Sequence, residues 1–212
     1  HIFILFFSLY MIYIMSMNLG TIWSNSGSFK HNSNRLVVAQ PQPQSQPQRS
    51  VSNPQQSLNV NNRATRSFWG SATWFFFHTI ACRINSNYYS QNYEYVWNFL
   101  KRICFTLPCP HCQQHATNYV KNVDVRSINT KEKLIKFLFD FHNSVNSRTG
   151  KQVENKSVLE RYKSANIKKI FDFFEQRFFF SYIGRRQFDD WIKNEVKSEY
   201  YKFYNNLRLH FD

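Results

Sequence analysis

Two cysteines in the segment Leu107–Cys112 (LPCPHC) carry the clearest chemistry in this 212-residue chain. Thiols two residues apart can form a disulfide and exchange it with an external dithiol. Pro110 suits the first position of a helix, so Cys109 is expected to be its N-cap. Because unpaired N–H groups there favour a thiolate, we expect the pKa of Cys109 to lie below the usual value of about 8.5. Cys109 is therefore predicted to react with substrate thiols, and Cys112, one turn later, to pass electrons onward.

Two other uses of this cysteine pair are less favoured. A structural zinc site could use Cys109 and Cys112 with His111 or His115, but such a site needs four ligands and the chain has no second Cys pair. A thioredoxin-type fold would place a strand directly before the motif, whereas residues 96–103 show helical periodicity. Redox chemistry on a helical scaffold is the preferred interpretation.

Polar and aromatic residues at helical spacing lie on both sides of the cysteine pair. Trp74 and His78 are four residues apart, so they share one face of an expected helix. Downstream, the face of the expected helix 130–148 that should pack into a bundle core carries polar side chains among the apolar ones. Positively charged side chains follow at the end of this helix. A hydrogen bond to nearby backbone would explain a buried His or a buried Asn alone. Taken together with Trp74 and His78, the polar stripe indicates a bound polar cofactor. The downstream residues are His142, Val145, Asn146, Thr149, Arg148 and Lys151.

The hydrophobic periodicity predicts an all-α fold. We expect a four-helix bundle with an additional short helix and a C-terminal helical extension. Pro108 ends the second helix, and Gly150 closes the fourth. The expected helices cover residues 68–83, 93–105, 110–121, 130–148, 158–180 and 187–207.

The composition divides the chain into four parts. Residues 1–17 are apolar and could serve as a signal peptide or anchor, although the uncharged stretch 2–15 is short for a membrane span. The alternative is that this segment is not translated, because Met11, Met15 or Met17 is the true start. Residues 18–66 are rich in Gln, Pro, Ser and Asn and are expected to form a disordered arm. The helical domain is assigned to residues 67–180 and the extension to 181–212.

The chain is strongly basic, with a formal net charge of +14 and a pI near 9.8. Such a charge suits nucleic acid, an acidic membrane surface or a phosphate-bearing cofactor. No run of Lys and Arg exceeds two residues, so a solvated basic surface is the simpler explanation and nucleic acid is not the expected partner. A non-enzymatic helical protein that binds nucleic acid or a virion surface is the alternative function.

Three ordered motifs resemble the Erv/ALR-type FAD-linked sulfhydryl oxidases, especially compact versions encoded by large DNA viruses. The first is Trp69-Gly70-x3-Trp74-x3-His78-x2-Ala81, the second is Leu107-Pro108-Cys109-x2-Cys112, and the third is His142-Asn143-x-Val145-Asn146-x3-Gly150-Lys151. The resemblance covers about residues 68–174.

This resemblance implies a four-helix bundle that binds FAD, usually as a homodimer. It implies oxidation of protein dithiols to disulfides, with molecular oxygen as the acceptor and hydrogen peroxide as the product. Cys109 and Cys112 would be catalytic, and no metal is implied. A viral protein of this kind would act in the host cytoplasm or virion, and one with a working signal segment in the endoplasmic reticulum. By position, the FAD contacts would be Gly70, Trp74, His78, Cys112, His142, Asn143, Val145, Asn146 and Lys151.

Several positions depart from the cellular members of that family. Ser71 replaces a common Arg, and Arg83 stands where an aromatic residue is frequent. No cysteine pair lies outside the central window that could shuttle electrons, so substrate thiols would attack Cys109 directly. Cys82 and Cys104 are expected to be either buried thiols or a bridge between neighbouring helices.

Overall fold

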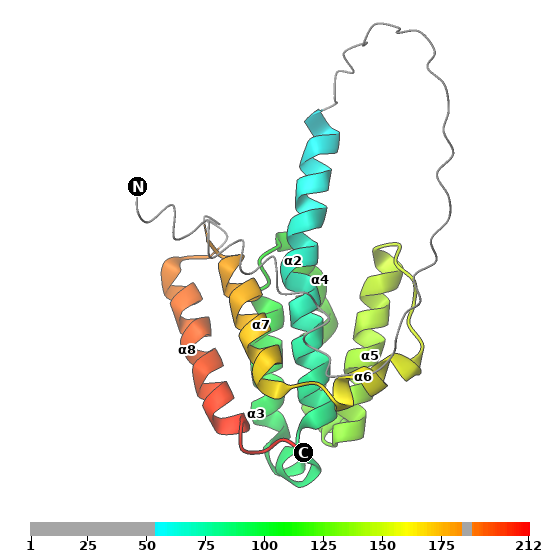
Figure 1. Cartoon of the computed structure of the whole chain (residues 1–212), viewed down its shortest axis with the longest axis vertical. Helices are drawn as coiled ribbons and strands as arrows, with labels where there is room; N and C mark the ends of the chain where they lie inside the picture. The colour runs from blue at the N-terminus through cyan, green and yellow to red at the C-terminus, as the bar shows by residue number, and fades with distance from the viewer. Residues whose placement is uncertain (1–53, 184–187) are drawn as a thin grey trace, which may run out of the picture. The chain divides into compact units, whose positions relative to one another are not determined.

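The computed structural model describes residues 54–183 and 188–212, with side chains from Phe68 onward (Figure 1). These residues form helices and turns, and their only β pairing is an isolated bridge between Ile84 and Phe211. The all-α prediction is confirmed. The predicted apolar segment and most of the arm lie outside the described residues. The α-helices are α2 (Pro54–Arg83), α3 (Ser86–Phe105), α4 (Pro110–Val120), α5 (Lys131–Arg148), α6 (Glu160–Lys163), α7 (Ile167–Phe180) and α8 (Asp190–Leu207), with 3-10 helices η2 (Val125–Ile128) and η3 (Lys156–Leu159).

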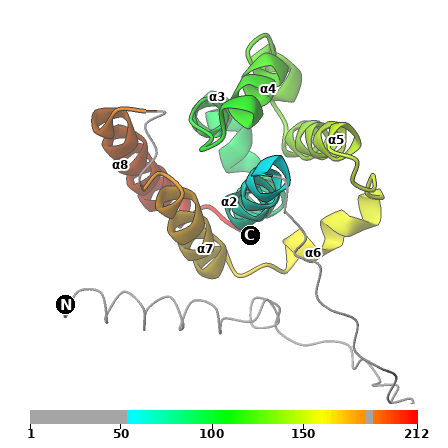
Figure 2. The ribbon, with the colours of Figure 1, turned by 90° about the horizontal axis from the view of Figure 1, so that it is seen from above.

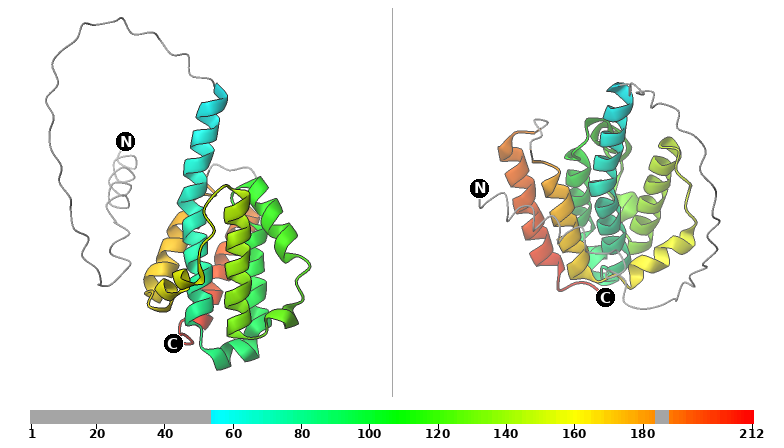
Figure 3. Two further views of the ribbon diagram at one scale, coloured as in Figure 1. Left: turned by 90° about the vertical axis from the view of Figure 1, so that its right-hand side faces the viewer. Right: turned by 45° about the horizontal axis from the view of Figure 1, so that its top comes forward.

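Within the compact unit Ala64–Asp212, α2 is the central helix. Helices α3, α4 and α5 lie to one side of it, and α7 and α8 lie to the other (Figure 2). The chain reverses between α3 and α4, and again between α7 and α8. The C-terminal ends of α3 and α7 therefore lie at the same end of the unit as the N-terminal ends of α4 and α8 (Figure 3).

Aromatic stacking ties α7 and α8 to the rest of the core. The Phe76 ring on α2 stacks on Phe174 of α7 with centroids 4.1 Å apart, and Phe99 on α3 stacks on Phe203 of α8 at 4.0 Å. All four side chains are at most 7% exposed. Burial of such rings is a large source of stability. The segment expected to be an extension is thus part of the hydrophobic core.

Helix α3 begins earlier than its apolar pattern predicts. Its N-cap is Asn85, whose side-chain oxygen accepts hydrogen bonds from the backbone of Asn87 and Tyr88 at 3.1 Å. At Asn92 the backbone leaves the helical region (φ −129°, ψ 18°). The predicted start at Tyr93 is therefore wrong, because it marks the residue after an internal kink.

The predicted continuous helix over 158–180 is also wrong. The chain forms η3 and α6 first, and α7 begins after Asn166. The side chain of Asn166 accepts a hydrogen bond from the Lys169 amide at 3.0 Å, so it caps a new helix. Helix α8 begins at Asp190, and α2 begins at Pro54, before the expected domain boundary near residue 67.

None of the helices in the part of the chain that the structure describes combines the length and apolarity needed to cross a membrane. The candidate anchor, residues 2–15, lies outside the described residues.

Candidate functional site

The cysteine pair lies at the N-terminus of α4. Cys109 is the N-cap, and its sulfur accepts a hydrogen bond from the Cys112 amide at 3.4 Å. The two Sγ atoms are 2.7 Å apart, and both residues are half-buried. Pro110 occupies the first turn. The predicted cap is confirmed, and the sulfurs need only a small side-chain movement to form a disulfide.

Three of the predicted contact residues form one cluster between α2 and α5. The Trp74 and His142 rings stack nearly parallel, with centroids 4.0 Å apart. Nε2 of His78 lies 3.0 Å from Nδ1 of His142, within hydrogen-bonding distance. His78 is 2% exposed, whereas Trp74 and His142 are half-buried. The structure therefore brings together residues 64 positions apart in the chain.

Burial keeps both imidazoles of this cluster neutral. It lowers the pKa of His78 to about 3, with further effects from His142 and the Arg161 guanidinium. It lowers the pKa of His142 to about 4, with help from Arg161 and Lys151. At neutral pH one ring donates a hydrogen to the other, and neither carries a charge.

Phe141 connects this cluster to the helix that carries the cysteines. Its ring lies 5.2 Å from Trp74 and 4.3 Å from Tyr119 on α4, centroid to centroid. It also stacks on His115 of α4, with ring centroids 6.4 Å apart. His115 lies three residues after Cys112, which is about one turn of α4. The dithiol and the indole–imidazole cluster are thus neighbouring parts of one region.

The end of α5 holds the remaining predicted residues. Asn146 is 6% exposed, and Val145 is half-buried. Gly150 adopts φ +68°, and the Lys151 amide donates to the Asn146 carbonyl at 2.8 Å, which completes the helix stop predicted there. Asn143 differs from its neighbours: its amide pairs with the backbone N–H and carbonyl of Glu154 at 2.9 and 3.0 Å. Its observed role is to hold the loop between α5 and η3, which contains Glu154.

Gly70 lies on α2, one turn before Trp74. A Cβ atom placed there would meet no atom within 4 Å. Packing within the described protein therefore does not require a glycine at this position. The open space beside it is compatible with a ligand.

Arg161 and Tyr162 are additional site residues that the sequence did not reveal. Tyr162 is 2% exposed, and its ring lies 4.8 Å from that of His78. The Arg161 guanidinium lies 4.9 Å from the Tyr162 ring and donates a 2.8 Å hydrogen bond to its hydroxyl. Both residues belong to α6, which sequence reasoning merged into one long helix. The adjacent Arg–Tyr pair offered no periodic signal.

The unusual Arg83 has a structural role at the C-terminal end of α2. Its Nη1 donates to the Ala165 carbonyl at 2.8 Å, and its Nε donates to the backbone oxygen of Asp212 at 2.8 Å. It thus fastens the segment before α7 and the last described residue to the end of α2.

Cys82 and Cys104 are separate buried thiols. Each lies one residue before the end of its helix, and α2 and α3 run in opposite directions. Cys82, at the C-terminal end of α2, therefore lies near the start of α3, whereas Cys104 lies at its end. The 20-residue helix α3, about 30 Å long, keeps the two thiols apart. Burial raises the pKa of Cys82 to about 11 and that of Cys104 to about 12, so both stay protonated.

The donor set of the cluster fits a flavin dinucleotide. Trp74 and His142 offer flat, half-buried ring surfaces, and the buried Nδ1 of His78 has no hydrogen-bond partner among the described residues. Arg161 and Lys151 place positive charge beside the imidazoles. Such charge suits a diphosphate. The described residues contain no group of three or more His, Cys, Asp or Glu side chains arranged to hold a metal ion.

Comparison with known proteins agrees with this assignment. The sequence profile of the Erv1/Alr family matches residues 71–172. An FAD-linked sulfhydryl oxidase of Invertebrate iridescent virus 6 is 37% identical over 99 residues, which cover 44% of this chain and 89% of that protein. A similar protein of Invertebrate iridescent virus 3 is 36% identical over 45% of this chain and 66% of its own length, just under two thirds. One from African swine fever virus is 27% identical over 50% of this chain and 87% of its own.

No solved structure matches the chain significantly. The family profile, the viral relatives and the arrangement of the dithiol beside the aromatic cluster all agree. The chain therefore belongs to the Erv1/Alr family of FAD-linked sulfhydryl oxidases.

Proposed function

We propose that this chain oxidises thiol pairs of protein substrates to disulfides, with FAD as its cofactor and molecular oxygen as the final acceptor, which becomes hydrogen peroxide. One observation carries the proposal: the helix α4 that begins with the cysteine pair packs, through Phe141, against an indole–imidazole cluster contributed by α2 and α5. Membership of the Erv1/Alr family supports the same activity.

Cys109 is the proposed point of attack for substrate. A substrate thiolate attacks Sγ of Cys109 in the Cys109–Cys112 disulfide, and Cys112 leaves as a thiolate. A second substrate thiol, after losing its proton, attacks the substrate sulfur of the mixed disulfide and releases Cys109. The substrate has then lost two electrons and two protons, and the cysteine pair holds the electrons. The helix N-terminus favours each leaving thiolate.

FAD, when bound, would accept the two electrons of the reduced cysteine pair and deliver them to oxygen. The chain's own contribution is placement. Trp74 and His142 supply stacking surfaces, and Lys151 and Arg161 supply positive charge for a diphosphate. The neutral His78–His142 pair keeps the buried centre of the site free of charge. The proposed FAD contacts are Gly70, Trp74, His78, Cys112, His142, Asn143, Val145, Asn146, Lys151 and, in addition, Arg161.

A homodimer is part of the proposal and follows from the family resemblance. Helices α7 and α8 cover one side of α2 and α3 through the Phe76 and Phe99 contacts. A second copy would therefore bind elsewhere on the molecule. Light scattering on the purified 25.6 kDa chain measures the oligomeric state.

The decisive experiment compares Cys112→Ser with the wild-type chain. The wild-type protein should carry flavin absorbance and consume oxygen when dithiothreitol is added. The Cys112→Ser variant should retain the flavin absorbance and lose oxygen uptake, because no electrons reach the cofactor. Cys104→Ala is the matched control, since this buried thiol lies on α3 and belongs neither to the cysteine pair nor to the indole–imidazole cluster. A colourless folded wild-type protein, or turnover that survives in Cys112→Ser, would refute the proposal.

A further inference from the structure

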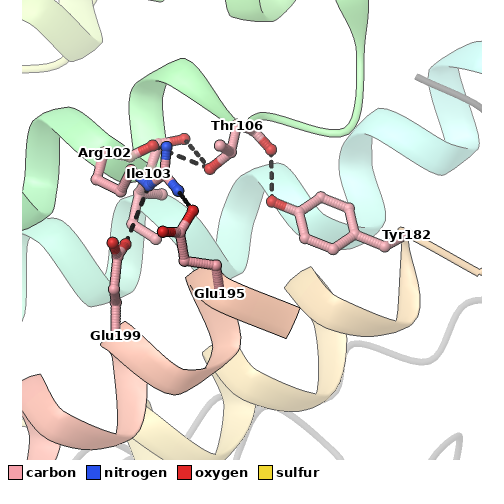
Figure 4. Close-up of polar contacts among 6 residues, drawn as sticks. All are labelled: Arg102, Ile103, Thr106, Tyr182, Glu195 and Glu199. Carbon is pink, nitrogen blue, oxygen red and sulfur yellow. Dashed lines mark hydrogen bonds and ion pairs between the residues drawn. The ribbon is translucent and has the colours of Figure 1, made fainter. Parts of the chain in front are cut away.

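The end of α7 contacts the polypeptide just before the redox motif (Figure 4). The Tyr182 hydroxyl donates a 2.6 Å hydrogen bond to the Thr106 carbonyl. Tyr182 is 5% exposed and Thr106 is 3% exposed, so water does not compete for this bond. Tyr182 lies outside residues 71–172, to which the family profile extends. The contact therefore joins a part of the chain beyond the family match to the loop that leads to Cys109.

This bond completes the end of α3. The helix ends at Phe105 with Thr106 as its C-cap, and the last carbonyls of a helix lack partners within it. The Thr106 carbonyl is bonded by Tyr182, and the Phe105 carbonyl accepts a 2.6 Å bond from Nε2 of Gln113 on α4. Both carbonyls before the loop thus depend on side chains from other elements.

Ion pairs hold α8 against the same turn. Arg102 on α3 pairs with Glu195 and with Glu199, in the latter case through Nε and Oε2 at 3.0 Å (Figure 4). The Arg102 carbonyl also accepts a 2.9 Å hydrogen bond from the Thr106 hydroxyl. The α7–α8 hairpin is therefore attached to the last turn of α3 at two separate points.

We propose that Tyr182 is a positioning residue for the Cys109–Cys112 pair, a role that rests on the proposed function of that pair. Two residues, Leu107 and Pro108, separate Thr106 from Cys109, and the Cys109 sulfur in turn accepts a hydrogen bond from the Cys112 amide. The Tyr182 bond fixes the start of this short loop, and the N-cap bond fixes its end. Tyr182 thereby keeps Cys109 in the position where the helix N-terminus stabilises its thiolate.

Loss of the hydroxyl should make the disulfide harder to reduce. The Thr106 carbonyl would stay buried without a partner, and the loop would have to rearrange to satisfy it. Cys109 would then spend less time at the cap, so the reduced pair would lose stabilisation of its thiolate. Because a disulfide is more oxidising when its reduced form is stabilised, the variant pair should be a weaker oxidant.

The test compares Tyr182→Phe with Tyr200→Phe in the full chain. Tyr200 is a matched control because it is also buried in the hairpin and donates to a backbone carbonyl, that of Phe171, at 2.9 Å. The protein is equilibrated in glutathione buffers, where its disulfide and two glutathione thiols exchange for the protein dithiol and glutathione disulfide. Alkylation and mass analysis of the peptide with Cys109 and Cys112 then give the equilibrium constant.

Tyr182→Phe should shift this equilibrium toward the protein disulfide by about threefold to tenfold, which equals about 14 to 30 mV. Tyr200→Phe should leave it unchanged, even if both variants unfold at lower denaturant concentration. A combined Glu195→Gln and Glu199→Gln variant should shift it in the same direction by a smaller factor. An unchanged constant in Tyr182→Phe, or an equal shift in Tyr200→Phe, would overturn the assignment. The measurement needs no oxygen turnover, so it is independent of whether the chain is an oxidase.

Discussion

At the scale of single residues, the histidine pair makes the stability of this protein sensitive to acid. His78 and His142 have pKa values lowered to about 3 and about 4 in the folded chain, against about 6.5 when unfolded. Between pH 4 and 6.5 the unfolded chain therefore binds more protons, and stability falls as the pH decreases. The stability that depends on the two neutral imidazoles is fully present above about pH 6.5. We expect a loss of about 2 to 4 kcal/mol between pH 7 and pH 5.

Urea unfolding at a series of pH values measures this effect. His142→Gln should flatten the dependence of the unfolding free energy on pH by about one proton. Trp74→Phe is the matched control, because it alters the same ring stack without removing a titratable group. The interpretation fails if the slope of His142→Gln equals that of Trp74→Phe.

The sequence revealed some site residues because their chemistry depends on local spacing. The Cys109 cap and Pro110 are fixed by four consecutive residues, and Trp74 and His78 by a single helical turn. The meeting of His78 with His142 follows from packing between α2 and α5, and spacing only made it plausible. Arg161 was missed because its role depends on where α6 places it against Tyr162.

At the scale of secondary-structure elements, local hydrogen bonds decided where helices begin. Pro110 located the start of α4, and the apolar pattern located α5, whose capping residue Thr130 stands directly before its apolar stripe. It misplaced the start of α3 and joined α6 to α7, because Asn85 and Asn166 bind backbone N–H groups at positions with no apolar signal. Asparagine side chains compete with helix continuation, so periodicity alone does not detect such breaks.

Two glycines in α2 and at the end of α5 should respond in opposite ways to alanine. Gly70 is helical with open space around it, so Gly70→Ala should stabilise the protein without FAD by about 0.5 to 1 kcal/mol. Gly150 has φ +68°, so Gly150→Ala should destabilise it by about 1 to 2 kcal/mol.

Flavin titration separates these folding effects from binding. Gly70→Ala should weaken FAD binding despite its greater stability, because the added methyl group fills space beside the proposed site. Thermal unfolding of both variants without FAD provides the stability comparison. If Gly70→Ala binds FAD as well as the wild-type chain does, the assignment of Gly70 as a contact is wrong.

At the scale of the whole molecule, the described fold is larger than the region shared with its relatives. The family profile ends at residue 172, within α7, yet α7 and α8 provide much of the aromatic core around Phe76 and Phe99. The sequence predicted a helical extension correctly but could not show that it packs into the core. An amphipathic charged helix has the same pattern of apolar and charged residues whether it docks on its own chain or on a partner.

Phe203 provides the sharpest test of this larger core. It is 1% exposed and stacks on Phe99, so Phe203→Ala should reduce the free energy of unfolding by about 3 to 5 kcal/mol. Trp191→Ala on the same helix is the control, because Trp191 is 70% exposed and should change stability by less than about 0.5 kcal/mol. Denaturant unfolding measures both. Equal, small effects would mean that α8 is an appendage to the core. A large effect of Phe203→Ala alone would show that this chain needs its own C-terminal helices to complete the fold that holds the redox pair.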